Sequence, residues 1–280
     1  MSSNTTLRIL SSFFIMGLLW MIFWLGKSAL LIALVIAMMV ILDEIFKNFL
    51  QEKRNSFNYI FSQLSLLIPF LLLFFVPWED SRSIFSFFVH LGLLNNIFLL
   101  IYLILIPLED LTLISRAKKR PYLIGLFYLP FVVCLGSILN FEMWERYIIA
   151  LLVINYGMDT GGWFFGKLMG KHKLWPSISP KKTVEGLIGG IFTSATLGCL
   201  FWHFAIHPVN YLHFWIFAFF AFISQMGDLV QSKLKRQFGV KDSSKMIPGH
   251  GGLYDRADSL IFLAPFFVGA LRYIKGYYLA

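Results

Sequence analysis

The chain has 280 residues, of which 58% are hydrophobic and only 14% are charged, and it contains 31 Phe and 8 Trp. A soluble domain of this length needs more polar surface than this, so the composition excludes a single soluble globular protein and indicates a multi-pass membrane protein. Cys134 and Cys199 both lie in apolar runs and are far apart in sequence. We therefore expect neither a disulfide framework nor a zinc site.

Stretches of mostly apolar residues that are long enough to cross the hydrocarbon core as helices recur along the chain. They predict an all-α, polytopic integral membrane protein with about nine transmembrane helices. Arg8 precedes the first stretch, as in a signal peptide, but its long apolar run and the span that follows at once favour a retained helix. The predicted spans are 8–26, 28–46, 57–77, 83–106, 121–141, 145–165, 184–206, 211–231 and 257–279.

The basic residues are unevenly divided between the two sides that nine spans define. Of the 24 Lys and Arg residues, 19 fall on the side of the N-terminus and 5 on the opposite side. Positive residues stay in the cytoplasm, so we expect a cytoplasmic N-terminus and an external Ala280. The net charge of +9 then becomes a one-sided field that faces anionic head groups and cytoplasmic anions. For residues 47–54 and 116–120, topology alone is the simpler explanation.

Chemically informative residues concentrate in the second half of the chain. We therefore divide it into N-terminal transmembrane helices at 1–144, with five spans, and a catalytic transmembrane region at 145–280, with four spans and two cytoplasmic catalytic loops. The first loop is expected at 158–190. It opens with Asp159 in an apolar stretch, followed by Gly161, Gly162, Gly166 and Gly170. Such glycines allow close approach of either a neighbouring helix or a ligand.

The first loop ends in the segment "SPKKTVEG", residues 179–186. Thr183 can cap the next helix, and Glu185 in its first turn suits the helix dipole. Free N–H groups at this helix start, together with Lys181 and Lys182, could bind a phosphate. The alternative is an ordinary helix cap beside lysines that only set the topology.

The second loop runs from Asp228 to Asp258. If the eighth span continues as a helix, Ser232 lies one turn beyond Asp228, and Lys235 and Arg236 lie another turn on, so these groups share a side. The segment "PGHGG" then forms a tight turn with exposed backbone amides. Asp255 and Asp258 are spaced i, i+3, which places both on one face of the last helix.

Acidic residues at the edge of the hydrocarbon are costly and indicate function. A lone acid is often only paired with a basic neighbour, whereas three acids flanked by lysines favour a hard divalent cation such as Mg²⁺, whose shell is completed by water and phosphate oxygens. Lysines and Arg256 would hold the remaining phosphate charge. These patterns predict a magnesium-dependent enzyme that acts on phosphates at the inner membrane face, without naming its substrate.

The same residues resemble the phosphatidate cytidylyltransferase family, also called the CDP-diglyceride synthases. The likeness is close over residues 155–265. Its longest motif covers 27 positions: Ser232, Lys235-Arg236, Lys241-Asp242, Ile247-Pro248, His250-Gly251-Gly252 and Asp255-Arg256-Ala257-Asp258. The segment 158–186 also resembles the Asp-Ser/Thr-Gly opening and the "SPKKT-x-EG" close of the family. Ala257, Val184 and Lys167 depart from residues common in the family, and we expect them to affect packing only.

The resemblance implies that CTP and phosphatidic acid are converted to CDP-diacylglycerol and pyrophosphate. It also implies Mg²⁺, a nearby second, monovalent cation such as K⁺, and a homodimer. Asp228 and Asp255 match the metal-binding carboxylates of the family, and Asp258 is close by. The positions tied to substrate phosphates are Ser179, Lys181, Lys182 and Thr183, to which we add Ser232, Lys235 and Arg236 as candidates.

The remaining candidate catalytic residues are Lys241, His250 and Arg256, beside the three acids. We expect that His250 is not a general base, because the lipid phosphate is already an anion near neutral pH. Alternatives are a CTP-dependent polyprenol or lipid kinase, which would release CDP, and an ion-coupled transporter. Charges gathered at one face argue against a transporter. Besides the substrates and membrane lipids, no nucleic acid is expected as a partner, and the expected location is a bacterial inner (plasma) membrane.

Overall fold

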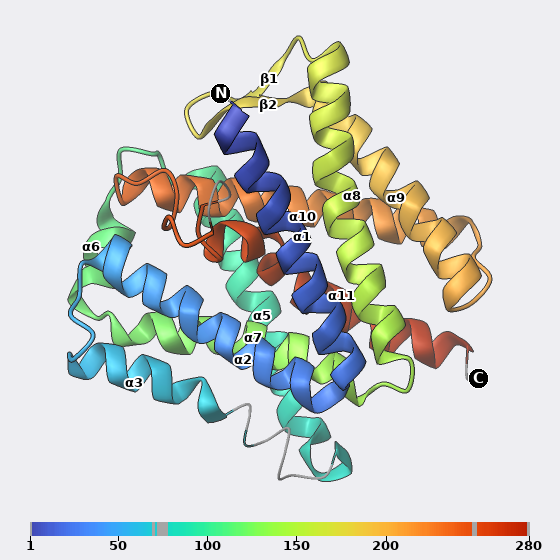
Figure 1. Cartoon of the computed structure of the whole chain (residues 1–280), viewed down its shortest axis with the longest axis horizontal. Helices are drawn as coiled ribbons and strands as arrows, with labels where there is room; N and C mark the ends of the chain where they lie inside the picture. Colours follow the sequence, from blue (N-terminus) through green and yellow to red (C-terminus); the bar gives the residue numbers. More distant parts are fainter. Residues whose placement is uncertain (1, 69–70, 72–77, 248–250, 279–280) are drawn as a thin grey trace.

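The computed structural model of the chain describes residues 2–68, 71, 78–247 and 251–278. Helices dominate these residues, and one small β-hairpin projects from one end (Figure 1). The N-terminal half contains α1 (Ser2–Leu25), α2 (Lys27–Glu44), the π-helix η1 (Ile45–Leu50), α3 (Phe57–Ser65), α5 (Trp78–Leu105), α6 (Thr112–Lys119), α7 (Tyr122–Ser137) and the 3₁₀ helix η2 (Ile138–Asn140). The C-terminal half contains α8 (Trp144–Met169), β1 (Lys173–Trp175), β2 (Ser179–Thr183), α9 (Val184–Ala205), α10 (Tyr211–Gln237) and α11 (Tyr254–Tyr278).

The predicted membrane character is confirmed. Six helical segments within the described residues are long and apolar enough to cross a bilayer, so the chain is a multi-pass membrane protein. They are Lys27–Leu50, Ser83–Leu105, Tyr122–Asn140, Trp144–Met169, Val184–Ala205 and Tyr211–Gln237. Helices also begin at or near the other three predicted spans, as α1, α3 and α11. Part of the predicted span 57–77 lies outside the described residues, so the count of nine stays a prediction, as does the division at residue 144.

Helices α8 and α9 pack closely through small residues. A Cβ atom added to Gly161 would lie 2.6 Å from the Cβ of Thr193, and one added to Gly190 would lie 2.6 Å from the Cε of Met158. Small residues let two helix backbones approach each other inside a membrane, where apolar side chains gain nothing by leaving lipid. These glycines therefore serve a neighbouring helix, which was one of the two alternatives left open by the sequence.

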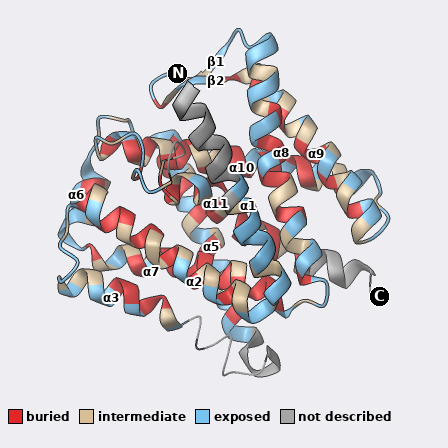
Figure 2. Ribbon diagram, in the orientation of Figure 1, coloured by how far each residue is buried: buried red, intermediate tan, exposed pale blue. Residues whose placement is uncertain are grey.

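The segment expected to form the first loop is mostly ordered secondary structure, which corrects the prediction. Helix α8 continues to Met169, so Asp159 lies within a helix. The segment after it forms an antiparallel hairpin in which Lys173 pairs with Thr183 and Trp175 with Ser179. Ile178, in the turn, is buried and joins the core of the C-terminal helices. The all-α fold class is confirmed, and this two-stranded hairpin, which lies beside the ends of α8 and α9 in Figures 1 and 2, is a small addition to it.

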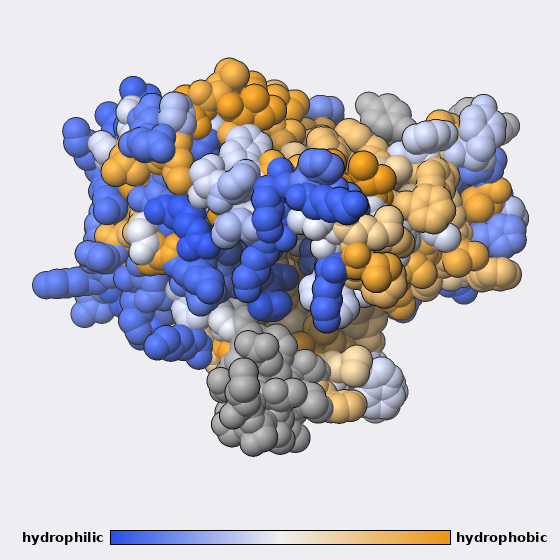
Figure 3. Space-filling view, turned by 90° about the horizontal axis from the view of Figure 1, so that it is seen from above, coloured by the Kyte–Doolittle hydropathy of each residue, from blue (hydrophilic) through white to orange (hydrophobic). Residues whose placement is uncertain are grey.

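The C-terminal part of α10 is fastened to the end of α5. The buried Nζ of Lys233 donates to the carbonyls of Tyr102 (2.8 Å), Leu103 (3.2 Å) and Ile106, where α5 ends. An ammonium group suits the free carbonyls at a helix C-terminus. Gln237 donates to the carbonyls of Leu108 (3.1 Å) and Asp110 (2.7 Å), just before α6. Hydrophilic residues gather mostly toward this end of the molecule, which carries α6, when it is seen from above (Figure 3).

Candidate functional site

One face of α10 carries an acid, a hydroxyl and a base, as the helical spacing predicts. The Oγ of Ser232 donates to the Oδ1 of Asp228 at 3.3 Å. One turn further, Lys235 donates to the Oδ1 of Asp255 (2.9 Å) and the Oδ2 of Asp258 (3.4 Å) on α11. Arg236 is exposed, because one more residue turns the side chain by more than a quarter turn around the helix. The expectation that Arg236 acts together with Asp228 therefore stays a prediction.

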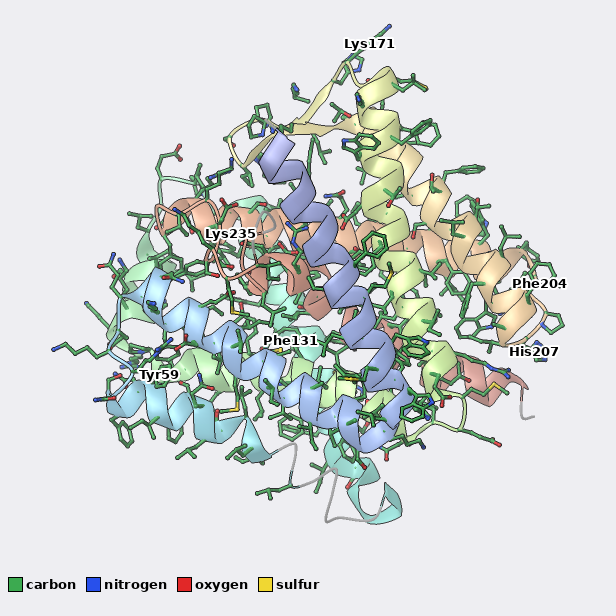
Figure 4. All side chains as sticks on the ribbon, viewed as in Figure 1. Tyr59, Phe131, Lys171, Phe204, His207 and Lys235 are labelled. Carbon is green, nitrogen blue, oxygen red and sulfur yellow. The ribbon has the colours of Figure 1, made fainter. Side chains whose placement is uncertain are left out.

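The first turn of α11 supplies two buried carboxylates. The Oδ2 of Asp255 accepts from the backbone N–H of Ser243 (2.8 Å), the hydroxyl of Ser243 (2.9 Å) and the N–H of Gly252 (3.0 Å). Asp258 accepts from the N–H of Ser259 at 2.8 Å. Both acids contact the ammonium group of Lys235, whose side chain is only 10% exposed. Figure 4 labels Lys235. The spacing i, i+3 thus brings the two acids to one cation.

The hairpin delivers a second lysine to the acids. The Nζ of Lys182 forms an ion pair with the Oδ2 of Asp228, and both side chains keep about a quarter of their surface exposed, at 22% and 26%. Thr183 caps α9 by accepting from the N–H of Gly186 at 3.1 Å, which confirms the predicted cap. Of the other predicted phosphate-binding residues on this strand, Ser179 is half-buried and Lys181 is exposed. The hairpin therefore carries cations to the cytoplasm-facing ends predicted for α8 and α10.

The charged side chains of Asp159 and Arg256 also lie close enough to interact with these groups. Asp159 on α8 interacts with Asp228, Lys182 and Arg256, and Asp258 interacts with Asp228. Acids from α8, α10 and α11 therefore share one neighbourhood with basic residues from β2, α10 and α11. We call this set the polar cluster: Asp159, Lys182, Asp228, Ser232, Lys235, Asp255, Arg256 and Asp258.

Two predicted site residues are not placed in the polar cluster. Lys241 is exposed on the connection between α10 and α11, and no contact brings it to the acids in the part of the chain that the structure describes. His250 lies outside the described residues, so its predicted role stays a prediction. Beside it, Gly251 has a φ of +83°, in the left-handed region that favours glycine, and its carbonyl accepts from the N–H of Ile247 at 2.8 Å. The Ile247–Gly251 pairing flanks the glycine-rich motif, and the turn itself stays a prediction because residues 248–250 lie outside the described residues.

Glu44, at the end of α2, is a residue that the sequence analysis missed. Its carboxylate is 4% exposed and accepts from the hydroxyls of Ser243 (3.0 Å) and Ser244 (2.5 Å) and from the N–H groups of Leu253 (3.0 Å) and Tyr254 (2.9 Å). It therefore caps α11 from a helix far away in the sequence. A Cβ at Gly252 would lie 2.7 Å from this carboxylate and 1.9 Å from the Oγ of Ser243, so a glycine is required there.

The carboxylate oxygens of the polar cluster are the kind of ligand that a hard divalent cation prefers. No three His, Cys, Asp or Glu side chains are grouped closely enough to hold a metal among the described residues. Magnesium is commonly held by only one or two carboxylates, with water and substrate phosphates completing its shell. Asp228, whose carboxylate is part-exposed, and Asp255 are the residues that would hold it.

The chain is similar to known proteins of one family. The sequence profile of the cytidylyltransferase family matches residues 6–274. The chain is 46% identical over 121 residues to proteins named phosphatidate cytidylyltransferase from Staphylococcus aureus (strain COL) and Bacillus subtilis (strain 168), and 47% identical to one from Staphylococcus epidermidis (strain ATCC 12228). Each match covers 43% of this chain and 45% or 46% of the relative, so the matched part spans slightly less than half the length of these proteins.

Proposed function

The chain belongs to the cytidylyltransferase family, and on this premise we propose that it is a phosphatidate cytidylyltransferase. It would convert CTP and phosphatidic acid to CDP-diacylglycerol and pyrophosphate. The observation that supports this most directly is the polar cluster, in which Lys182 from the hairpin meets Asp228 of α10, beside the acids of α11. A site at the ends of apolar helices suits one substrate anchored in lipid and another dissolved in water.

The reaction is a displacement at the α-phosphorus of CTP. A phosphate oxygen of phosphatidic acid forms a new P–O bond, and the bond to the oxygen that bridges the α- and β-phosphates breaks, so pyrophosphate leaves with its electron pair. The nucleophile is already an anion, so no strong base is needed. The difficulty lies in bringing two polyanions together and in stabilising the charge of the transition state, which positioned cations provide.

We assign roles to residues according to their contacts. The side chain of Lys182 is 22% exposed and lies on a strand that leads into the N-terminus of α9, which supports a role in binding a substrate phosphate. Lys235 keeps the carboxylates of Asp255 and Asp258 together despite their repulsion. Arg256 and the exposed Lys181 and Arg236 supply further positive charge for pyrophosphate. Ser232 and Ser179 are hydrogen-bonding candidates, and Lys241 and His250 remain candidates from the resemblance alone.

We further propose that Asp228 and Asp255, with Asp258 beside them, hold Mg²⁺. When bound, this ion would neutralise phosphate charge and polarise the phosphoryl oxygens. The second, monovalent cation and the homodimer also remain proposals, supported by the family resemblance. The N-terminus and the two catalytic segments are proposed to face the cytoplasm of a bacterial plasma membrane, which the distribution of basic residues supports.

A purified preparation in detergent tests the proposal directly. With CTP, phosphatidic acid and Mg²⁺, we expect CDP-diacylglycerol and pyrophosphate in equal amounts, and no turnover when excess chelator is present. Release of CDP together with a phosphorylated lipid would identify a lipid kinase and refute the proposal. Absence of any nucleotide turnover, combined with ion uptake into proteoliposomes, would instead identify a transporter.

A further inference from the structure

An apolar cavity of about 540 Å³ lies between α5, α6, α7 and α10. Its walls come mainly from aromatic and aliphatic side chains, including Phe127 of α7, Ile114 of α6 and Phe238, just beyond α10. This volume is in the range of cavities that bind small ligands, which is about 300–1,000 Å³. An apolar lining of this kind suits a hydrocarbon chain and offers little to a nucleotide.

The cavity opens beside residues that face lipid. Phe98 on α5 is 50% exposed and Leu123 on α7 is 45% exposed, and both line the cavity. Both helices are long and apolar enough to cross the bilayer. Exposed apolar side chains on such helices contact acyl chains, so the cavity can be entered from the lipid phase.

A cationic rim borders the same cavity. Arg116 and Lys119 of α6 and Arg120, which follows it, line the cavity and are exposed. Helix α6 is short and amphipathic, with Ile114 buried on one side and these basic residues toward solvent. Basic residues on an interfacial amphipathic helix attract anionic lipid head groups. The combination of an apolar cavity and a cationic rim therefore complements an anionic phospholipid.

The cavity also adjoins the polar cluster through consecutive residues. Leu234 lines the cavity, and the next residue, Lys235, holds the two acids of α11. Tyr254 lines it as well, and the next residue is Asp255. Lys233 and Gln237 bind the end of α5 and the segment that leads into α6. These contacts fix the position of α10 relative to α6.

We infer that this cavity binds the lipid substrate: an acyl chain of phosphatidic acid occupies the apolar space, and its phosphate is received at Arg116, Lys119 and Arg120 before reaching the polar cluster. This inference rests on the proposed function, since it names where the lipid of that reaction binds. It also gives the basic residues 116–120 a task beyond setting the topology.

Photolabelling tests the binding site without relying on activity. Phosphatidic acid with a diazirine in one acyl chain is bound to the purified full-length protein, and the labelled peptides are mapped by mass spectrometry. We expect labels in α6, α7 and the end of α10, with strong competition from unlabelled phosphatidic acid and weak competition from phosphatidylcholine. Equal competition by phosphatidylcholine would show ordinary lipid contact, and equal competition by phosphatidylglycerol would show a general anionic-lipid site. Either result overturns the inference.

Substitutions in α6 provide the matched kinetic test. Ala117→Phe fills the cavity, whereas Ser115→Phe adds the same side chain on the exposed side of the helix. We expect Ala117→Phe to raise KM for long-chain phosphatidic acid about tenfold or more, equivalent to about 1.4 kcal/mol of binding, with KM for CTP unchanged. A short-chain phosphatidic acid should show a smaller difference. Unchanged KM and labelling in a folded Ala117→Phe variant would overturn the inference.

The rim is tested with exposed residues, whose replacement leaves the packing intact. Arg116→Gln, Lys119→Gln and Arg120→Gln combined should raise KM for phosphatidic acid, and this difference should shrink at high salt. Lys53→Gln, at an exposed lysine away from the cavity, is the control. If the wild-type protein turns over substrate and the rim variant matches it, the cavity inference fails while the proposed function stands. If the wild type does not turn over these substrates, the proposed function itself fails.

Discussion

The carboxylate of Glu44 accepts a hydrogen bond of 2.9 Å from the backbone N–H of Tyr254, 210 residues later in the chain. Ser243 extends this contact, because its hydroxyl lies 3.0 Å from Glu44 and 2.9 Å from Asp255. One buried acid of the N-terminal half thus supports the loop and the helix start that orient a proposed metal-binding acid. The two halves of the chain are therefore joined at the site itself.

We expect Glu44→Ala to impair both stability and metal use. It leaves the buried N–H of Tyr254 and the part-buried N–H of Leu253 without their acceptor, at a cost of about 1–3 kcal/mol for the buried one. The thermal unfolding temperature in detergent should fall, and the Mg²⁺ concentration for half-maximal activity should rise, because Asp255 loses its support. Glu44→Gln keeps one acceptor oxygen and should lie between Ala and the wild type.

Asp43→Asn is the matched control for Glu44. Asp43 is the neighbouring acid on α2, but it pairs with Arg54 at 2.6 Å and with Tyr59, away from the polar cluster. It should leave the magnesium dependence unchanged. Equal magnesium dependence in Glu44→Ala and the wild type would show that Glu44 only stabilises the fold.

The proposed metal ligands make a second prediction. Asp228→Ala and Asp255→Ala should each abolish turnover while the protein remains folded and inserted, because each removes a carboxylate that would hold Mg²⁺. Pyrophosphate release at saturating Mg²⁺, with size-exclusion chromatography as the folding check, measures this. Asp110→Asn, at an acid outside the cluster that accepts from the N–H of Thr112, is the control. More than a few per cent of residual activity in either Ala variant would exclude that acid as an essential ligand.

The helices and half of the site follow from local patterns in the sequence. Apolar runs locate the membrane helices, and the helical repeat predicts that Ser232 reaches Asp228, as its 3.3 Å contact confirms. The hairpin escapes this kind of reasoning, because strands of three and five residues are too short to establish an alternating pattern. The proximity of Lys182 to Asp228, across 46 residues, depends on that hairpin.

Polar contacts between residues far apart in the chain cannot be predicted from local sequence patterns either. Glu44 follows an apolar run, so the sequence around it predicts only a charged residue at the end of a helix. No residue near it in the sequence indicates that its hydrogen-bond partners begin at Ser243. The sequence predicts that Lys233 is another basic residue of a cytoplasmic loop. In the structure it is 1% exposed and binds the carbonyls at the end of α5. Tertiary packing decides such cases, since each buried polar group must find a partner wherever the fold offers one.

The sidedness proposed from the basic residues makes a third prediction. In a background lacking Cys134 and Cys199, a cysteine at Lys171 should be protected from an impermeant thiol reagent in intact cells and labelled in inverted membranes. A cysteine at Pro208, in the connection between α9 and α10, should show the reverse. Both positions are exposed in the structure, so the comparison reports the side of the membrane. Labelling of residue 171 in intact cells would reverse the topology.

Two adjacent basic residues of α10 provide the last prediction. Lys235 contacts both Asp255 and Asp258, and all three side chains are at most 10% exposed, whereas Arg236 is exposed. Removing one partner of a buried ion pair leaves a buried charge uncompensated, which costs about 3–5 kcal/mol. Lys235→Ala should therefore lower the thermal unfolding temperature markedly and abolish turnover.

Arg236→Ala should leave the unfolding temperature close to that of the wild type, because no buried charge loses its partner. The variant lacks a positive charge that attracts CTP to the site, so KM for CTP should rise while kcat changes little. Measuring unfolding and kinetics on both variants separates the roles. If Lys235→Ala unfolds at the wild-type temperature, the two carboxylates do not depend on this lysine for their burial, and its assignment as the cation that holds them together is wrong.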